Sequence, residues 1–187
     1  TVDENGTVTP INVGSTAVVA ESEGAKTTVS VEVYTITMSS TDDWIAMLKC
    51  GNDVNARFYL SNDLDFTGVN YRTYSSWQAS ENDLIFMGEV DGGGHTVGNI
   101  TYDPTYPEQS VFGDAEGVNI HDLAVKNVTF NAKAQQGLFK DVKHIVRDNA
   151  VVAASYITNV ICDFAYSGAV ADEICGVSGK VYGLNMT

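Results

Sequence analysis

Apolar and polar residues alternate along much of the chain, a pattern typical of β-strands with one face in a core and the other in water. The alternation is clear on both sides of an acidic, glycine-rich turn at residues 91–95. It continues through residues 111–130, where the recurring apolar residues are Val118, Ile120, Leu123, Val125, Val128 and Phe130. The pattern predicts an all-β protein built of short strands and tight turns.

The strand-and-turn unit repeats along the chain. Residues 86–100 are followed by a similar unit at 111–130, and residues 137–139 echo residues 111–113. A unit that recurs about every 20 to 30 residues is typical of a β-solenoid, in which each coil buries its inward side chains against the neighbouring coils. We therefore expect at least three stacked coils with parallel strands within residues 58–140. The side chains expected to share one core are Phe86, Val97, Ile120, Val125 and Leu138.

One segment, at about residues 41–50, has helical rather than strand periodicity. The apolar residues on one face of this helix are Trp44, Ile45, Met47 and Leu48. Ser40 or Thr41 can cap its N-terminus, and Gly51 can end it. We expect the helix to cover the open end of the solenoid, where unpaired backbone would otherwise attract another chain.

Particular residues along these units form a longer motif. They are Asp91, Gly92, Gly94, His95, Thr96, Val97, Asn99 and Ile100, then Phe112 and Gly113, then Ile120, Leu123, Val125, Asn127 and Val128, and later Gly137, Leu138 and Phe139. This pattern resembles the GLUG-type repeats of bacterial surface proteins over about residues 41–140. Asp122 stands where the family prefers Asn, and Lys140 where it prefers Gly. The resemblance implies a right-handed parallel β-helix; no coil register is predicted after residue 140, where residues 150–164 fit one coil or two buried strands.

The N-terminal segment has a different character. Alternating apolar residues and turn residues in residues 1–37 predict three short strands. The segment resembles the second half of a bacterial group 2 immunoglobulin-like domain. Half a sandwich leaves one sheet face open to water. The missing strands therefore lie upstream, come from another chain, or are unnecessary because the segment packs on the solenoid; the expected division is a partial Ig-like segment at 1–37 and a β-helix domain at 38–187.

Composition narrows the class of partner. The 187 residues include 24 acidic and 10 basic ones, a formal net charge of −14, which repels nucleic acid and anionic membranes. No apolar run of about 18 residues occurs, so no membrane insertion is expected. The three cysteines are Cys50, Cys162 and Cys175. They are either buried free thiols or include a bridge between Cys162 and Cys175.

The acidic residues and histidines are the candidates for catalysis. Polysaccharide lyases and hydrolases of the β-helix class need carboxylates clustered with a basic residue. Asp63, Asp65 and Asp91 fit either such a cluster or the capping of loop amides. His95 is expected to hydrogen-bond within its turn. His121 and His144 lack the spacing of metal ligands to each other or to acidic pairs, so we expect no catalytic residue, metal or cofactor.

Exposed aromatic residues are the most suggestive binding feature. An insert at residues 69–83 carries Tyr71, Tyr74 and Trp77, and a second loop carries Tyr102 and Tyr106. Such residues can stack on sugar rings or fill a protein interface. Alternatively, Trp77 folds back onto the first coil and the tyrosines shield its edge.

These expectations favour a secreted, non-catalytic structural or adhesive module of a bacterial surface protein, which extends a binding surface for glycan or protein. The alternatives are a phage virion appendage or a self-assembling surface filament subunit, and part of a carbohydrate-active β-helix enzyme. Each places the chain outside the cell, on a bacterial or virion surface. Flanking domains or neighbouring copies are the partners expected at its open ends.

Overall fold

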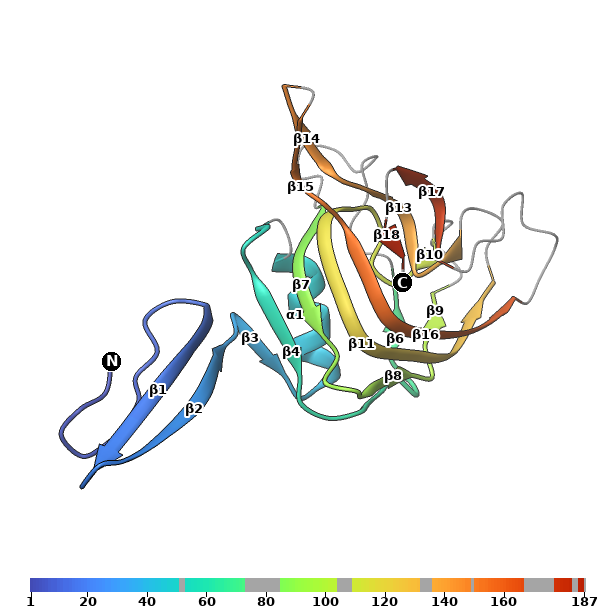
Figure 1. Ribbon diagram of the computed structural model, residues 1–187. Coiled ribbons are helices and arrows are strands. Elements are labelled where there is room, and N and C mark those ends of the chain that lie inside the picture. Colours follow the sequence, from blue (N-terminus) through green and yellow to red (C-terminus); the bar gives the residue numbers. More distant parts are fainter. Residues whose placement is uncertain are drawn as a thin grey trace.

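Parallel strand pairing organises most of the chain (Figure 1). The computed structural model describes residues 1–50, 53–72, 85–103, 109–131, 136–148, 150–166, 177–182 and 185–186. In these ranges the only helix is α1 (Thr41–Cys50), and the remaining regular structure is strand. The predicted all-β class is confirmed. At ten residues and with three charged side chains, α1 is no candidate for a membrane-spanning helix, and the described part of the chain has no other.

The strands along the main path of the large sheet lie in chain order, and other elements connect most of them. These strands are β3 (Ile36–Met38), β4 (Arg57–Leu60), β7 (Phe86–Asp91), β11 (Ala115–Phe130), β13 (Phe139–Lys143) and β17 (Ser178–Tyr182). The long strand β11 also pairs with β16 (Tyr156–Tyr166), which in turn pairs with β18 (Asn185–Met186). All of these pairs are parallel.

Short strands continue the same stacking around the turns. The parallel pairs are β5 (Leu64–Asp65) with β8 (Thr96–Gly98), β6 (Asn70–Tyr71) with β9 (Thr101–Tyr102), and β10 (Gln109–Ser110) with β12 (Gln136–Gly137). Both β8 and β9 also pair with β11. The parallel pairing predicted for residues 58–140 is therefore confirmed for the pairs that the structure describes.

In the core, the register of the parallel strands sets apolar residues against apolar residues. Val90 of β7 pairs with Ile120 of β11, which pairs with Ile157 of β16. Val97 and Val125 form an equivalent pair. The side chains predicted to be buried, Phe86, Val97, Ile120, Val125 and Leu138, are all fully buried. The prediction of a shared core is confirmed.

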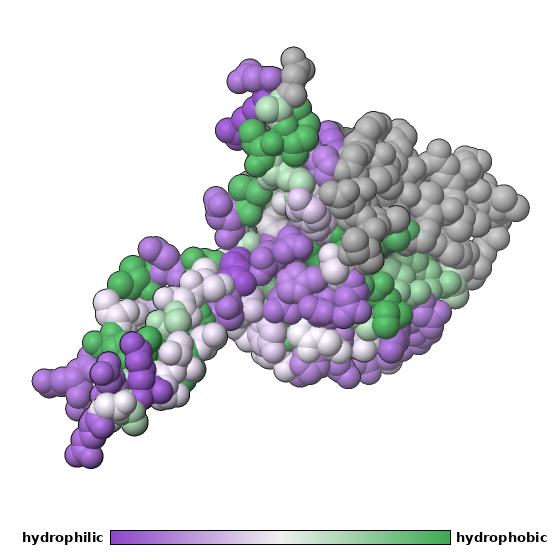
Figure 2. Space-filling model, viewed as in Figure 1, coloured by the Kyte–Doolittle hydropathy of each residue, from purple (hydrophilic) through white to green (hydrophobic). Residues whose placement is uncertain are grey.

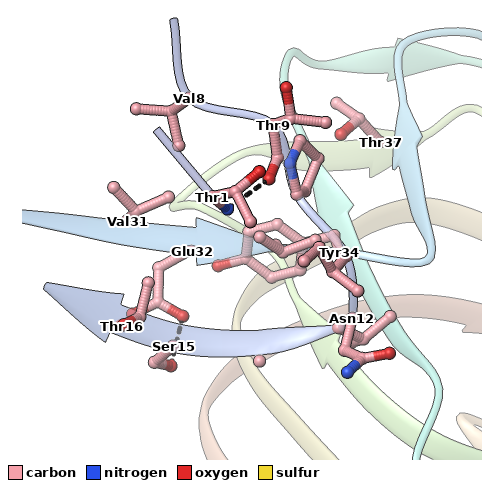
Figure 3. A pocket seen from close by; sticks show the side chains of 15 residues that line it. Thr1, Val8, Thr9, Asn12, Ser15, Thr16, Val31, Glu32, Tyr34 and Thr37 are labelled. Atoms are coloured by element: carbon pink, nitrogen blue, oxygen red, sulfur yellow. Dashed lines mark hydrogen bonds between the residues drawn. The ribbon is translucent and has the colours of Figure 1, made fainter. Parts of the chain in front are cut away.

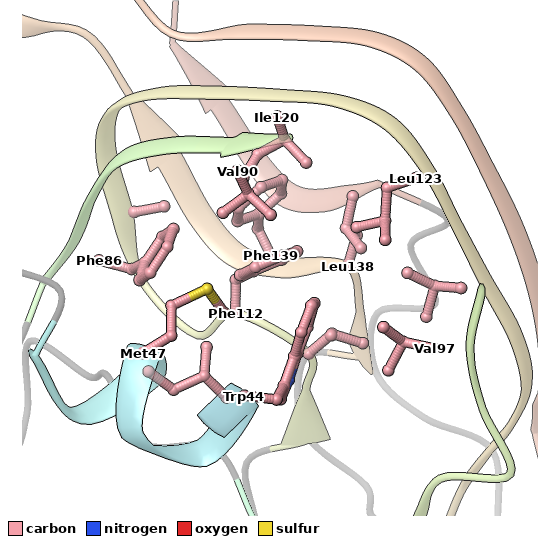
Figure 4. Close-up of a cluster of buried hydrophobic side chains, with 14 of the residues drawn as sticks. Trp44, Met47, Phe86, Val90, Val97, Phe112, Ile120, Leu123, Leu138 and Phe139 are labelled. Carbon is pink, nitrogen blue, oxygen red and sulfur yellow. The ribbon is translucent and has the colours of Figure 1, made fainter. Parts of the chain in front are cut away.

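Two columns of aromatic rings run along this core. The first is Phe58, Phe86, Phe112 and Phe139, with successive ring centroids 5.2–6.2 Å apart, and Figure 4 shows its middle part. The second is Phe66, Tyr71, Tyr102, Phe130 and Phe164, with successive centroids 5.2–5.3 Å apart. Each such pair contributes about 0.5–1.5 kcal/mol beyond the burial of its area.

The chain turns its corners at residues with a left-handed backbone. Asn99, Asp122, Asn127 and Asn159 have φ between 52° and 59°. Asn and Asp tolerate this region better than other residues with a Cβ atom. The amides also stack, because Asn127 donates to Asn99 and Asn99 donates to Asp65. These hydrogen bonds join neighbouring parts of the parallel sheet.

Helix α1 begins where the sequence indicates. The backbone N–H of Asp43 donates to Ser40 Oγ (3.2 Å), and the Asp43 carboxylate accepts from the Ser40 N–H (2.9 Å), a reciprocal cap. The buried face of the helix carries Trp44 and Met47, which point toward the phenylalanine column (Figure 4). Trp44 Nε1 also donates to the hydroxyl of Tyr71 (3.0 Å). The helix packs against β3, the last strand at one end of the main sheet.

The N-terminal hairpin projects from this stack (Figure 1). Strands β1 (Gly14–Ser22) and β2 (Ala25–Val33) pair along their whole length in antiparallel register. An isolated bridge joins Val2 and Val8 ahead of them. Strand β3 already belongs to the main sheet, so the domain boundary predicted after residue 37 falls inside this strand.

A second hairpin occupies the region where no register was predicted. It joins β14 (Ile145–Arg147) to β15 (Ala150–Ala153) in antiparallel fashion. The apolar run at residues 150–164 is divided between β15 and β16. The interpretation of this run as two buried strands is wrong for β15, because Val151 and Val152 are more than half exposed.

The buried register makes a direct prediction for stability. Ile120 lies between Val90 and Ile157, so Ile120→Ala should lower the free energy of unfolding by about 2–5 kcal/mol through lost burial and a cavity. Ile161, on β16, is 57% exposed and provides a matched control. Ile161→Ala should change stability by no more than about 0.5 kcal/mol. Urea denaturation measures both, and equal losses would contradict the assigned register.

Candidate functional site

The outward side chains of β4, β7 and β11 form two polar rows. Arg57 pairs with Glu89, and Glu89 pairs with Asn119. Tyr59, Asp91 and His121 lie in register two residues further along. Because parallel strands stack in register, outward residues distant in sequence become neighbours on one surface. The second row contains the most reactive side chains of this surface.

Arg57 joins the hairpin to the first row. Its guanidinium pairs with Glu32 of β2 (Nη1 to Oε2, 2.9 Å) and with Glu89 of β7 (Nη2 to Oε1, 2.8 Å). It also lies over the ring of Tyr34, 4.9 Å from the centroid. The pKa of Glu32 is lowered by hydrogen bonds from Ser15 and then Arg57. Partly exposed ion pairs contribute little energy, so their main effect is to orient the hairpin.

Asp91, His121 and Asp122 converge on one point of the surface, and we call them the Asp-His-Asp cluster. His121 Nδ1 lies 2.9 Å from Asp122 Oδ2 and 3.8 Å from Asp91 Oδ1. One potential ligand atom of each residue lies within 4.8 Å of those of the other two. The three side chains are partly exposed, so the cluster is open to solvent.

Hydrogen bonds hold both carboxylates of the cluster. Asp91 Oδ1 accepts from the Gly93 N–H (2.8 Å), and its Oδ2 accepts from the Tyr34 hydroxyl (3.0 Å). Burial, followed by this hydrogen bond to Asp91, raises the pKa of Tyr34 to about 12. The phenol therefore stays protonated and remains a donor at neutral pH. Hydrogen bonds from Asn159 and then His121 lower the pKa of Asp122.

The backbone at Asp122 explains why adjacent residues face the same way. Side chains in a regular strand alternate between faces, yet His121 and Asp122 both lie toward solvent while Ile120 and Leu123 are buried. The left-handed conformation of Asp122, with φ of 52°, interrupts the alternation. Two consecutive polar side chains thus reach the surface at one corner.

The aromatic residues predicted to bind a ligand divide into two groups. Tyr71 and Tyr102 are fully buried members of the second aromatic column, and Tyr71 donates to the carbonyl of Val111 (2.8 Å). Their rings fill the core, because Tyr71 packs edge-to-face against Tyr102 and Tyr102 stacks on Phe130, and they are not surface residues. Tyr74, Trp77 and Tyr106 lie outside the described residues, and their predicted role stays a prediction.

The other acids considered for catalysis bind loop groups. Asp63 Oδ1 accepts from the Thr96 N–H (2.8 Å) and lies 3.2 Å from His95 Nδ1. Asp65 Oδ1 accepts from the Thr67 N–H (2.9 Å) and from Asn99. The loop-capping alternative is thus the one observed for both. His95 contacts its own turn through the backbone, since its N–H donates to Gly92 O.

The sequence analysis missed the grouping of acids around His121. His121 lies beside two acids, although linear spacing gave no sign of an acidic pair. The missing signal was the register of the repeats, which sets Asp91 against His121 across 30 residues. His144, by contrast, accepts a hydrogen bond from the Ser155 N–H (2.8 Å). Cys162 is a free thiol whose burial raises its pKa to about 11, and Cys175 lies outside the described residues.

A pocket of about 590 Å³ lies between the N-terminal segment and the hairpin (Figure 3). Val8, Ile11 and Val13 line it from one side, and Val31 and Val33 of β2 line it from the other. Within this group Ile11 is 71% exposed. The pocket is therefore an open, largely apolar groove at the base of the hairpin.

Comparison with known proteins gives no match: no family model fits the sequence, and no curated protein or solved structure resembles it significantly.

Because carboxylates cap the turns, the protein should become less stable at low pH. Hydrogen bonds from Asn99 and then Thr67 lower the pKa of Asp65 in the folded protein. The stability that these hydrogen bonds give is complete above the pKa of Asp65 in the unfolded chain, about 4. It is lost as the pH falls through the lower pKa of Asp65 in the folded protein. Asp65→Asn should therefore be less stable than the parent protein at neutral pH.

The difference between Asp65→Asn and the parent should shrink as pH falls below about 4. Urea denaturation at a series of pH values measures it. Ile161→Ala removes no titrating group, so its small effect should be independent of pH. A difference for Asp65→Asn that stays constant with pH would show that the carboxylate contributes nothing through its charge.

Proposed function

We propose that this chain is a non-catalytic structural and adhesive module of a bacterial surface protein. Its stack is a right-handed parallel β-helix, and its N-terminal segment is part of an Ig-like sandwich completed by other strands. The module acts outside the cell, where it extends a surface that binds glycan or protein. One observation carries the proposal: the N-terminal hairpin has an apolar face that the described residues cover only in part.

The β-helix is supported by the way in which the strands stack. Parallel pairs connect β3, β4, β7, β11 and β16 in register, and two aromatic columns follow the same direction. Corners at Asn99 and Asn127 lie in adjacent coils and are joined by their amides. Such stacking can continue for as many coils as the sequence supplies, which suits a module that extends a surface.

The hairpin is amphipathic. Val18 pairs with Val29, and Thr16 pairs with Val31, so these side chains share one face. The opposite face carries polar residues such as Ser15 and Glu32, which are also paired. Period-2 alternation of this kind is expected for a sheet with one face packed against a second layer.

That second layer is incomplete. The N-terminal segment approaches Val31 and Val33 across the groove of Figure 3, but Val29 remains 59% exposed. Hydrophobic side chains appear on the projecting hairpin in Figure 2. A two-stranded hairpin is only marginally stable in water, and exposed apolar patches often mark interaction sites. The hairpin therefore fits a partner that supplies a sheet face, from a flanking domain or a neighbouring copy.

The hairpin face makes the first prediction for function. The chain should self-associate as its concentration rises, because a second copy can cover Val29 and Val31. The double variant Val29→Thr/Val31→Thr keeps β-branched side chains but adds hydroxyls, so it should remain monomeric at concentrations where the parent associates. Light scattering coupled to size-exclusion chromatography measures the mass of both.

Val19→Thr is the matched control, since Val19 lies on the opposite face of the same hairpin and is 49% exposed. This variant should associate as the parent does. A parent chain that stays monomeric at high concentration, with the amides of residues 14–33 strongly protected from hydrogen exchange, would show that the hairpin needs no partner.

The non-catalytic role predicts the outcome of an activity assay. Asp63 and Asp65 already accept hydrogen bonds from turn groups, which supports a structural role for both. Incubation with pectic polysaccharides should therefore release no unsaturated uronides above the level of a heat-denatured sample. Release that disappears in Asp91→Asn would instead support the enzyme alternative.

A further inference from the structure

We propose that the Asp-His-Asp cluster binds a divalent transition-metal ion, with Zn²⁺ as the best fit. The ligands are Asp91 Oδ1, His121 Nδ1 and Asp122 Oδ2, and water completes the coordination. The proposal concerns a different face from the hairpin's apolar one and does not depend on the adhesive role.

The distances among the ligand atoms suit a small cation. Zn²⁺ bonds nitrogen and carboxylate oxygen at about 2.0–2.2 Å, so tetrahedral ligands lie about 3.4 Å from one another. In the cluster, His121 Nδ1 lies 2.9 Å from Asp122 Oδ2 and 3.8 Å from Asp91 Oδ1. These two separations lie on either side of the value for a tetrahedral site.

The backbone presents the three ligands without any loop rearrangement. Parallel register sets Asp91 of β7 directly against His121 of β11. The left-handed corner at Asp122 then adds a second outward ligand next to His121. Sites built on strands hold their geometry better than sites on loops. A bound ion would also join two adjacent coils.

Outer hydrogen bonds orient the carboxylates. Tyr34 donates to Asp91 Oδ2, and Asn159 donates to Asp122 Oδ1. In each aspartate this leaves the other oxygen toward His121. Asp91 Oδ1 also accepts from Gly93, but a carboxylate oxygen has a second lone pair available for a metal. Such outer contacts are a regular feature of protein metal sites and tune their affinity.

The donor set selects the class of metal. One imidazole with two carboxylates suits Zn²⁺ and neighbouring transition metals, whereas Ca²⁺ prefers six to eight oxygen ligands. The same three side chains can also contact one another with no ion bound. These alternatives differ in measurable metal affinity and in stoichiometry.

The test is a calorimetric titration of the whole chain with ZnCl₂ at neutral pH, after chelator treatment. Alkylation with iodoacetamide in denaturant, followed by refolding, removes thiols as competing ligands. One ion should bind per chain, and the melting temperature should rise with Zn²⁺ concentration because binding favours the folded state. Circular dichroism before and after alkylation checks that the fold is retained.

Variants identify the site. His121→Gln and Asp91→Asn should abolish binding or weaken it by more than a hundredfold. Tyr34→Phe removes only an outer hydrogen bond, so it should weaken binding by about 10-fold to 100-fold. His95→Gln is the matched control, because His95 contacts Asp63 rather than the cluster, and this variant should bind as the parent does.

Three results would overturn the proposal. They are the absence of saturable Zn²⁺ binding up to millimolar concentrations, unchanged affinity in His121→Gln, and Ca²⁺ binding as tight as that of Zn²⁺. The last result would mean that the imidazole is not a ligand.

Discussion

In-register stacking of parallel strands is the constraint on which the rest of this structure depends. Each inward side chain is buried only if the residues at the same position in the coils above and below are also apolar, as Ile120 is buried between Val90 and Ile157. A slip of one residue in β11 would turn Asn119 and His121 inward. Burying such polar groups without partners costs several kcal/mol each, so the correct register is strongly favoured.

The same constraint places polar residues as strictly as apolar ones. Asn99 and Asn127 occupy equivalent corner positions, and a chain of side-chain hydrogen bonds joins Asn127 to Asn99 and Asn99 to the carboxylate of Asp65. Asp91 and His121 meet for the same reason, since register alone makes them neighbours. The repeat therefore determines which residues are neighbours on the outer surface as well as in the core. A substitution in one strand changes the contacts of the strand beside it.

This dependence on register also explains what the sequence could predict. Period-2 alternation identified Phe86, Val97 and Ile120 as core residues, because burial leaves a local signal. Helix α1 was predictable because its cap and its apolar face lie within ten residues. These features need no knowledge of which coil lies against which.

Features that depend on contacts between coils were missed. Tyr71 and Tyr102 looked like surface aromatics because their loops are polar, but stacking sets them in line with Phe130. His121 showed only one adjacent acid, Asp122, because the second acid, Asp91, is 30 residues away in sequence. Aligning the repeats by their corner residues, Asn99 with Asn127, would have set Tyr102 against Phe130, but it would have set Asp91 against Asn119, because the register between β7 and β11 differs by two residues. Beyond residue 140 a left-handed corner recurs at Asn159, whose amide donates to Asp122, but the β14–β15 hairpin gave no comparable signal.

The N-terminal hairpin is governed by a different balance of forces. In the described part of the chain β1 and β2 pair with each other and with no other strand, so the stacking that stabilises the parallel sheet does not reach them. Two polar connections orient the hairpin instead: Glu32 binds Arg57, and Tyr34 donates to Asp91. Both end on the outward rows that include the Asp-His-Asp cluster. Because Tyr34 directly follows β2, rotation of the hairpin would move a hydrogen-bond donor of Asp91, so the orientation of the hairpin and the geometry of the cluster depend on each other.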